Sequence, residues 1–265
     1  MWPWTRTSDD PLATVIFDRY QMHMLRLPRA DVAVHDAWAM KDGQILPGKL
    51  SSLMDPAPPV PDVRIGEPVA DLNVVASKQI DAHLGFNFLE AFLSAIGAGA
   101  FPLKLKGTLE AKKAAGMRFR FAAATRDYVD PFKLEFQLRK HKVPAKSSLM
   151  KPDWKYFVAL AVLRTDSINI AAVKEDGTEV QIAEEAVKLA EVNANFSVRK
   201  SSGQEITITG GQRLAFAVQL SELAYNAEDR RFELNVVKNV VKVMGKAPQV
   251  GVETISAMDD GLVAL

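Results

Sequence analysis

The sequence contains no cysteine among its 265 residues. Disulfide bonds, thiolate nucleophiles, cysteine-ligated zinc sites and S-acylated anchors are therefore excluded, and a reducing compartment is favoured. An excess of one charge is also missing, because 33 Lys and Arg face 32 Asp and Glu. A general nucleic-acid binder would show a basic excess, so we expect no nucleic-acid partner.

Long apolar runs are missing as well. The N-terminus has no apolar core of a signal peptide, and the densest apolar run, residues 157–163, is far shorter than the roughly 20 residues of a membrane-spanning helix. We therefore expect a protein that is made and kept soluble in the cytoplasm.

Motifs for catalysis or metal binding are scarce. The histidines His23, His35, His83 and His141 lack metal-ligand spacing, and neither an HExxH nor a Gly-x-Ser-x-Gly motif occurs. The sequence thus predicts no catalytic residue, no metal and no cofactor.

One stretch imitates a phosphate-binding loop. Residues 43–49 have its spacing, but Leu50 follows where Ser or Thr would hold magnesium. Pro47 also removes a backbone N–H that such a loop needs, so we reject nucleotide binding.

The chain has enough apolar residues, 48%, to bury a substantial core. Apolar residues at three- and four-residue spacing predict a helix over Asp81 to Ile96, and a second helix is expected over Glu184 to Glu191. Residues 232–244 show a mixed helical pattern. The proline-rich stretch 55–68 is interpreted as a loop inside one domain, with a linker between two domains as the alternative.

Elsewhere the apolar period is two, which is typical of strands with one apolar and one polar face. A short strand is expected at residues 22–28, and alternating stretches follow at 103–109, 117–123, 168–172, 192–198 and 206–209. The fold class is therefore α+β, a single domain with a twisted, mostly antiparallel sheet surrounded by helices.

Two interpretations of these strands stay open. In the first, the strands form a soluble, half-buried sheet. In the second, some of the strands face lipid after a conformational change. A transmembrane strand needs about 9–11 alternating residues, and the stretches Leu103 to Thr125 and Asp166 to Lys200 can supply four such strands. Periodicity does not decide between the two.

A family resemblance favours the second interpretation. Over roughly residues 18–225, several stretches resemble bacterial gasdermins in their order and pattern. They are Asp18-Arg19-Tyr20 through Leu25-Arg26-Leu27-Pro28-Arg29, Gly48-Lys49-Leu50-Ser51-Ser52-Leu53, Ala70-Asp71-Leu72 to Gly85-Phe86, Met117-Arg118-Phe119-Arg120-Phe121, Asp127-Tyr128-Val129-Asp130 and Gly210-Gly211-Gln212-Arg213-Leu214-Ala215-Phe216-Ala217.

The resemblance implies a non-enzymatic, autoinhibited pore-forming protein. A protease removes a short C-terminal segment, and the freed part binds membrane lipids and assembles with itself into a large β-barrel pore that kills the cell in defence against phage. The protein would be a cytoplasmic monomer when inhibited and would lie in the inner membrane when active. The competing hypothesis is an α+β binding module for a protein or an apolar ligand.

The resemblance also assigns two membrane-inserting hairpins, at about residues 103–125 and 166–200. The residues expected to face lipid in the pore are Leu103, Leu105, Leu109, Met117, Phe119, Phe121, Ile168, Ile170, Phe196 and Val198. All of them except Leu109 and Met117 are also expected to be mostly buried in the soluble form. The cations expected to meet acidic lipid, on or between the strands of the first hairpin, are Lys104, Lys106, Lys112, Lys113, Arg118 and Arg120. Lys112 and Lys113 are expected at its turn.

The C-terminal residues form the predicted switch. Gly245, Lys246 and Ala247 precede Pro248 in a joint expected to be exposed and easily cut. They divide the chain into a pore-forming domain, 1–244, and an inhibitory segment, 245–265. The apolar residues expected to dock that segment are Val250, Val252, Ile255, Met258, Leu262 and Leu265.

One feature departs from the family. Bacterial gasdermins often carry an acylated cysteine near the N-terminus, and this chain has none. Trp2 and Trp4 are candidates for interfacial anchors in its place, because indole rings favour the headgroup region.

Overall fold

The computed structural model describes residues 16–17, 20–41, 44–54, 61–69, 80–98, 100–144, 154–190, 196–201 and 204–235. The predicted cleavage joint and inhibitory segment, residues 245–265, lie outside this part of the chain, as do Trp2 and Trp4.

Within the described ranges, twelve strands form one open sheet, and every strand pair is antiparallel. The strands are β1 (His23–Arg29), β2 (Asp36–Lys41), β3 (Gln44–Lys49), β4 (Arg64–Pro68), β5 (Ile80–Asp81), β6 (Gly116–Ala122), β7 (Thr125–Tyr128), β8 (Lys155–Val173), β9 (Glu179–Val180), β10 (Phe196–Lys200), β11 (Ile206–Asn226) and β12 (Arg231–Leu234). The helices are α2 (Ala82–Ala95), α3 (Phe101–Ala111), α4 (Pro131–Lys140) and α5 (Ala183–Ala190), and η1 (Leu50–Leu53) is a 3-10 turn.

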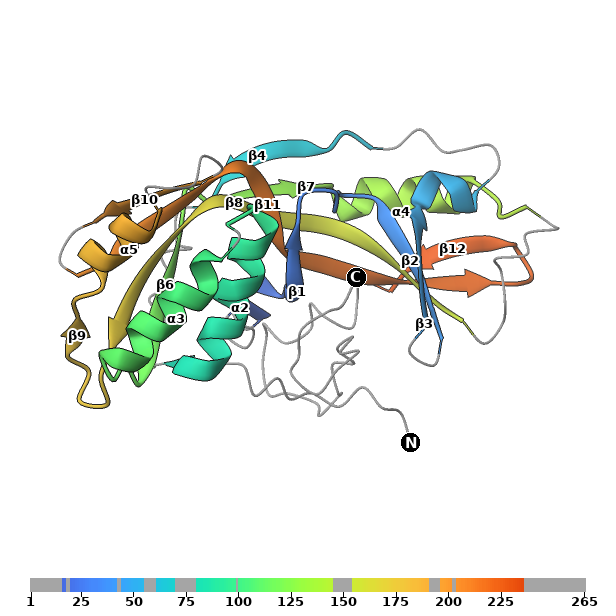
Figure 1. Cartoon of the computed structure of the whole chain (residues 1–265). Coiled ribbons are helices and arrows are strands. Elements are labelled where there is room, and N and C mark those ends of the chain that lie inside the picture. Colours follow the sequence, from blue (N-terminus) through green and yellow to red (C-terminus); the bar gives the residue numbers. More distant parts are fainter. Residues whose placement is uncertain are drawn as a thin grey trace, which may run out of the picture.

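Two long strands form the spine of the sheet. β8 has 19 residues and β11 has 21, and they pair along most of their length. From the middle of Figure 1 toward the right, β11 pairs first with β1 and then with β12, while β8 pairs with β7 and then with β2, which carries β3. We call this part the body.

At the other end, on the left in Figure 1, the spatial order is β6, β8, β11, β10. We call these four adjacent segments the distal sheet. It consists of β6, residues 167–173 of β8, residues 206–210 of β11, and β10.

The strands are irregular where the two parts join. β6 ends at Ala122 and β7 begins at Thr125, with Ala123 in the left-handed region at φ 48°. On β11, Thr209 pairs with Ser167 whereas Leu214 pairs with Thr165, so β11 carries extra residues at the same level. Bulges of this kind bend a sheet locally, so the distal sheet can leave the body at an angle.

Much of the predicted architecture is confirmed. The α+β class and the antiparallel sheet hold. The helix expected at 81–96 is α2, the one expected at 184–191 is α5, and the strand expected at 22–28 is β1.

Three expectations need correction. Residues 103–109 belong to helix α3 and not to a strand. Residues 232–234, placed in a mixed helical pattern, lie in strand β12. The end of the proline-rich loop, residues 64–68, is strand β4.

Candidate functional site

The distal sheet has one apolar face. Register pairs Phe121 with Ile168, Ile168 with Ile208 and Ile208 with Val198, so one apolar side chain from each of the four strands lies in a single row. A neighbouring row runs through Phe119, Ile170 and Ile206. All seven side chains are at most 8% exposed and belong to one core cluster.

The opposite face is polar. Arg120 lies beside Asn169, and Asn169 beside Thr207. Arg118 forms an ion pair with Glu179 of β9, and Arg120 Nη2 lies 3.4 Å from Glu205 Oε1. These four charged side chains remain between 17% and 36% exposed, so this face keeps contact with water.

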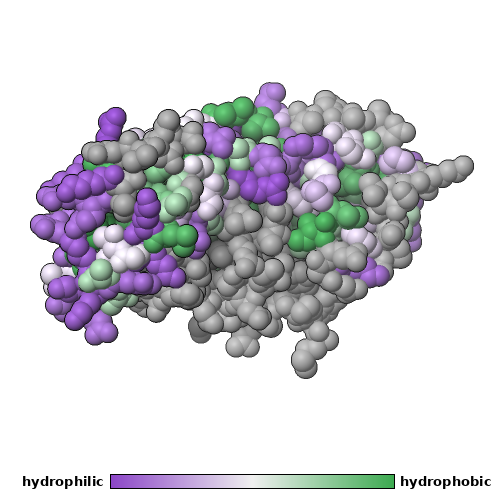
Figure 2. Space-filling model, viewed as in Figure 1, coloured by the Kyte–Doolittle hydropathy of each residue, from purple (hydrophilic) through white to green (hydrophobic). Residues whose placement is uncertain are grey.

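Helices cover the apolar face. α2, α3 and α5 share the core cluster with the distal strands, and the rings of Phe101 and Phe196 lie 5.0 Å apart, edge to face. In Figure 1, α2 and α3 lie side by side near this end of the sheet, and α5 lies at its tip. The surface at this end is mostly hydrophilic in Figure 2. The helices thus keep an apolar sheet face away from water.

α3 is a helix with few local supports. Its N-cap, Ala100, makes no side-chain hydrogen bond, and Gly107 lies in its interior, where glycine costs about 1 kcal/mol relative to alanine. Its buried residues Phe101, Leu105 and Leu109 recur every four positions. Tertiary packing therefore contributes much of its stability.

A salt bridge joins α3 to α5. Lys112 Nζ, just after α3, lies 2.7 Å from Glu185 Oε1 in the first turn of α5. This contact lowers the pKa of Glu185, mainly through the hydrogen bond from Lys112. It connects the two predicted hairpin segments on the outside of the molecule.

Most of the predicted inserting residues share this core. Of the ten, nine are buried, namely Leu105, Leu109, Met117, Phe119, Phe121, Ile168, Ile170, Phe196 and Val198. The expectation of burial is wrong for Leu103, which is 68% exposed on the outer side of α3. The helical period places Leu103 away from Leu105, whereas a strand would align them.

The six predicted lipid-binding cations do not lie on one surface. Lys104 and Lys106 are exposed on α3, which covers the apolar face, whereas Arg118 and Arg120 lie on the opposite, polar face. The prediction that these six cations lie together on or between two strands is therefore wrong for this structure. Lys112 and Lys113 do lie in a turn, between α3 and β6.

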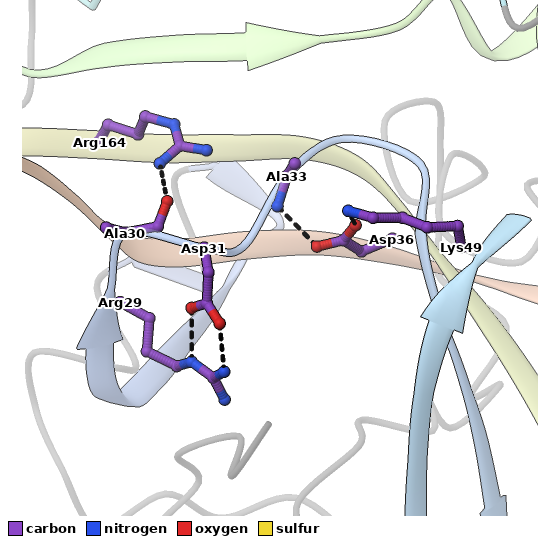
Figure 3. Close-up of polar contacts among 7 residues, drawn as sticks. All are labelled: Arg29, Ala30, Asp31, Ala33, Asp36, Lys49 and Arg164. Carbon is purple, nitrogen blue, oxygen red and sulfur yellow. Dashed lines mark hydrogen bonds and ion pairs between the residues drawn. The ribbon is translucent and has the colours of Figure 1, made fainter.

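A buried ion pair fixes the body where the distal sheet begins. Arg164 of β8 and Asp127 of β7 lie 2.7 Å apart, Nε to Oδ2, with side chains 16% and 12% exposed. Arg164 also donates to the backbone carbonyls of Ala30 (3.3 Å; Figure 3) and Val32, in the connection between β1 and β2. Where this connection ends, Asp36, the first residue of β2, accepts from Ala33 N and pairs with Lys49 of β3 (Figure 3).

The described residues contain no group of three or more His, Asp or Glu that could hold a metal ion. His35, at φ 68° and 8% exposed, lines a pocket of about 440 Å³. Burial lowers the pKa of His35 to about 4, although Asp36 acts in the opposite direction. No helix in the described ranges is both long and apolar enough to cross a membrane.

The comparisons agree with this architecture. The family model described as the Bacterial Gasdermin Family matches residues 25–233, well over half of the chain. Among solved structures, the chain is similar to a bacterial gasdermin from Bradyrhizobium tropiciagri, with a TM-score of 0.66 and 15% identity over 87% of this chain and 92% of that one. No curated protein matches the chain. The chain therefore belongs to the bacterial gasdermins, a family of pore-forming proteins that are not enzymes.

Proposed function

We propose that this chain is an autoinhibited pore-forming protein. A protease removes its C-terminal segment, the remaining domain assembles with itself in the bacterial inner membrane, and the resulting β-barrel pore kills the cell as a defence against phage. Before activation the chain is a cytoplasmic monomer.

The observation that carries this proposal is the two-faced distal sheet. Four adjacent antiparallel strands have an apolar face under helices and a polar face toward water. A membrane barrel needs the same alternation, with apolar side chains toward lipid and polar ones toward the lumen. If the helices left the apolar face of the distal sheet, its side chains could contact lipid.

Two of the four strands of the distal sheet are too short to span a bilayer, which needs about 9–11 residues per strand. β6 has seven residues and β10 has five. We therefore propose that α3 and α5 convert to strand. α3 has a sequence for this, because Leu103, Leu105 and Leu109 alternate with Lys104 and Lys106.

Register constrains the first hairpin. A three-residue turn at 111–113 places Leu105 opposite Phe119 and Leu103 opposite Phe121, all on the lipid face. Leu103, now exposed, then joins the apolar row, while Lys104 and Lys106 join Arg118 and Arg120 on the lumen face. In the second hairpin, a turn centred on Ala183 would place Ile170 opposite Phe196 and Ile168 opposite Val198, which requires β10 to leave β11 and to pair with β8.

Attraction to the membrane depends on charge, and autoinhibition depends on the tether between the domain and the inhibitory segment. The cations of the first hairpin attract anionic lipid, at about 1 kcal/mol for each Lys or Arg near the surface. The inhibitory segment 245–265 docks on the domain 1–244 through its apolar residues. Each contributes roughly 1.5–3 kcal/mol when buried, and the tether keeps the local concentration of the segment high until the joint is cut.

The direct test is dye leakage from liposomes. A specific protease site is inserted at Lys246, and the purified chain is added to vesicles containing phosphatidylglycerol before and after cutting. Leakage only after cutting supports the proposal. Intact vesicles after complete cutting, in several lipid mixtures, would contradict it.

A further inference from the structure

At the joint between the body and the distal sheet, one strand is continuous while the strands on both sides of it are interrupted. β8 runs through Asp166 as a single curved strand (Figure 1). On one side of it, β6 ends and β7 begins, and residues 123–124 lie outside both strand pairs. On the other side, residues 210–213 of β11 lie opposite Asp166 alone. Strand pairing is therefore broken at one level on both sides of β8.

The extra residues of β11 restrict how the joint can move. β11 carries four residues where β8 carries one, so removing this bulge would shift the distal part of β11 by three residues. A shift by an odd number of residues moves every side chain to the other face of a sheet. Ile206 and Ile208, which are buried on the apolar face, would then point to the polar face. A movement at this joint must therefore be a rotation of the distal sheet and not a slide of β11 along β8.

Hydrogen bonds hold the corner between β6 and β7 from three directions. The backbone carbonyls of residues 122–124 each accept from a different segment. Thr165 Oγ1 of β8 lies 2.8 Å from the first carbonyl oxygen, and Arg213 Nη2 of β11 lies 2.6 Å from the second. Val69 N, just after β4, lies 3.1 Å from the third. The corner thus has a defined position relative to the strands around it.

Of these three donors, Arg213 is the one that joins the two interrupted sides of the sheet. It belongs to the bulge of β11, and its guanidinium reaches across β8 to the carbonyl of Ala123. Arg213 is exposed, so this bond can be removed without leaving a cavity in the core.

A ring contact connects the two parts on the apolar side. Phe121 of the distal sheet and Phe216 of the body stack with their ring centres 4.2 Å apart and their planes within 4°. Both rings are buried. The proposed pore places Phe121 toward lipid, so this stack must open during insertion. The distal sheet therefore has to change its position relative to the body.

We propose that this joint is a hinge and that Arg213 holds the distal sheet at its resting angle. While the bond to Ala123 is intact, the bulge of β11 and the corner between β6 and β7 are fixed to each other. When the bond breaks, the distal sheet can rotate about β8 with its register and its two faces unchanged. Arg213 is thus a positioning residue for insertion and is not itself one of the lipid-facing residues.

The role in insertion rests on the proposed function, but the angle is measured in the uncut protein. The chain contains no cysteine, so Ile65→Cys on β4 and Glu175→Cys beyond the end of β8 provide two exposed sites for spin labels. β4 is a suitable reference because Gly66 N donates to Asp127 of β7 at 2.9 Å. Distances between the labels, measured by double electron–electron resonance, report the angle between the distal sheet and the body.

Three variants are compared in this labelled background. Arg213→Ala removes the bond, and Arg213→Lys keeps a charged donor at the same position. Gln212→Ala is the matched control, because it removes the neighbouring exposed side chain of the same bulge. Unfolding in urea should stay close to wild type for all three, which separates a change of angle from a loss of folding.

Arg213→Ala should broaden the distribution of label distances. After cutting at the engineered site, it should also release dye at least about threefold faster than wild type, because a bond made only in the resting state slows departure from that state. Arg213→Lys should stay closer to wild type than to Arg213→Ala, and Gln212→Ala should match wild type in both measurements.

A wild-type distance distribution or a wild-type leakage rate in Arg213→Ala would overturn the proposal. Equal broadening in Gln212→Ala would also overturn it, because the bulge as a whole and not the Arg213 bond would then set the angle. If cut wild type leaves vesicles intact, the proposed function fails instead, and the label distances still test the hinge.

Discussion

Arg164 Nε and Asp127 Oδ2 lie 2.7 Å apart where the body meets the distal sheet, and both side chains are largely buried. Asp127 also accepts from Gly66 N at 2.9 Å, while Arg164 holds the connection between β1 and β2. One ion pair therefore joins β4, β7, β8 and that connection. These elements form a fixed base from which the distal strands extend.

Removing one partner of this pair should destabilise the soluble protein. Arg164→Ala or Asp127→Ala leaves a buried charge without its partner, which costs about 3–5 kcal/mol. Urea unfolding of both single variants and of Arg164→Met with Asp127→Leu measures the effect. The apolar double variant should be more stable than either single variant. If the double variant loses as much stability as the two single variants together, the two side chains do not act as a pair.

Stability should also depend on pH through His35. Burial lowers its pKa in the folded protein to about 4 from the ordinary 6.5, so the unfolded chain binds the proton more readily. This contribution to stability is present above pH 6.5 and is lost as the pH falls from 6.5 toward 4.

His35→Asn should flatten this part of the stability profile, measured by urea unfolding between pH 7 and about 4. Asparagine is chosen because it tolerates the positive φ of 68° at this position. An unchanged slope would mean that other groups produce the acid sensitivity.

Gly107 offers a way to strengthen α3 without a new contact. A Cβ at this position meets no atom within 4 Å, so Gly107→Ala should raise the free energy of unfolding by up to about 1 kcal/mol. If α3 must leave its helical form during insertion, the cut variant should release dye more slowly than wild type. Faster leakage from a more stable variant would contradict conversion of α3.

Gly210 tests the packing of α2 on the distal sheet. A Cβ there would lie 2.6 Å from Cγ2 and 3.0 Å from Cβ of Ile96, just after α2. Gly210→Ala should therefore cost about 1–3 kcal/mol through overpacking. Adding Ile96→Ala should relieve the clash, so the double variant should lose less than the sum of the two single variants. Additive losses in thermal unfolding would show that the helix moves away freely.

The lipid-facing assignment is tested by charges on the two faces of one strand. Ile170→Asp should abolish leakage by the cut protein, because a charge on the lipid face costs about 2–4 kcal/mol at the midplane, in every subunit. Phe119→Asp should do the same. Asn169→Asp, on the polar face, should leak as wild type does.

Because Ile170 and Phe119 are buried in the soluble form, only variants that stay soluble and unfold cooperatively are informative. If such variants leak as well as Asn169→Asp, the distal strands are not the inserting ones.

Local pattern predicted some elements well and failed for others. α2 and α5 follow from helical spacing, and β6 follows from strict alternation of Phe119 and Phe121 with arginines. β8 was visible only from 168 onward, because residues 156–163 are buried on both faces and do not alternate. α4 gave little signal, since Phe132 and Phe136 are exposed and blur its apolar stripe.

The error at α3 has a physical cause. The stretch Leu103-Lys104-Leu105-Lys106 alternates, yet Phe101, Leu105 and Leu109 also fit a helical stripe, so one sequence satisfies both periods. Packing of Phe101 against Phe196 stabilises the helical form in this structure. The Arg164–Asp127 pair was beyond local reasoning altogether, because its partners are 37 residues apart.

A reversible cross-link between α3 and α5 tests the central claim most directly. Lys112 and Glu185 are in contact, and the chain contains no cysteine, so Lys112→Cys with Glu185→Cys introduces the only two thiols. A short bismaleimide with a reducible spacer joins them, and the protein is then cut at the engineered site and added to vesicles containing phosphatidylglycerol. We predict no leakage while the link holds the helices on the distal sheet, and rapid leakage once a reductant opens it. Leakage by the fully cross-linked protein would contradict the account.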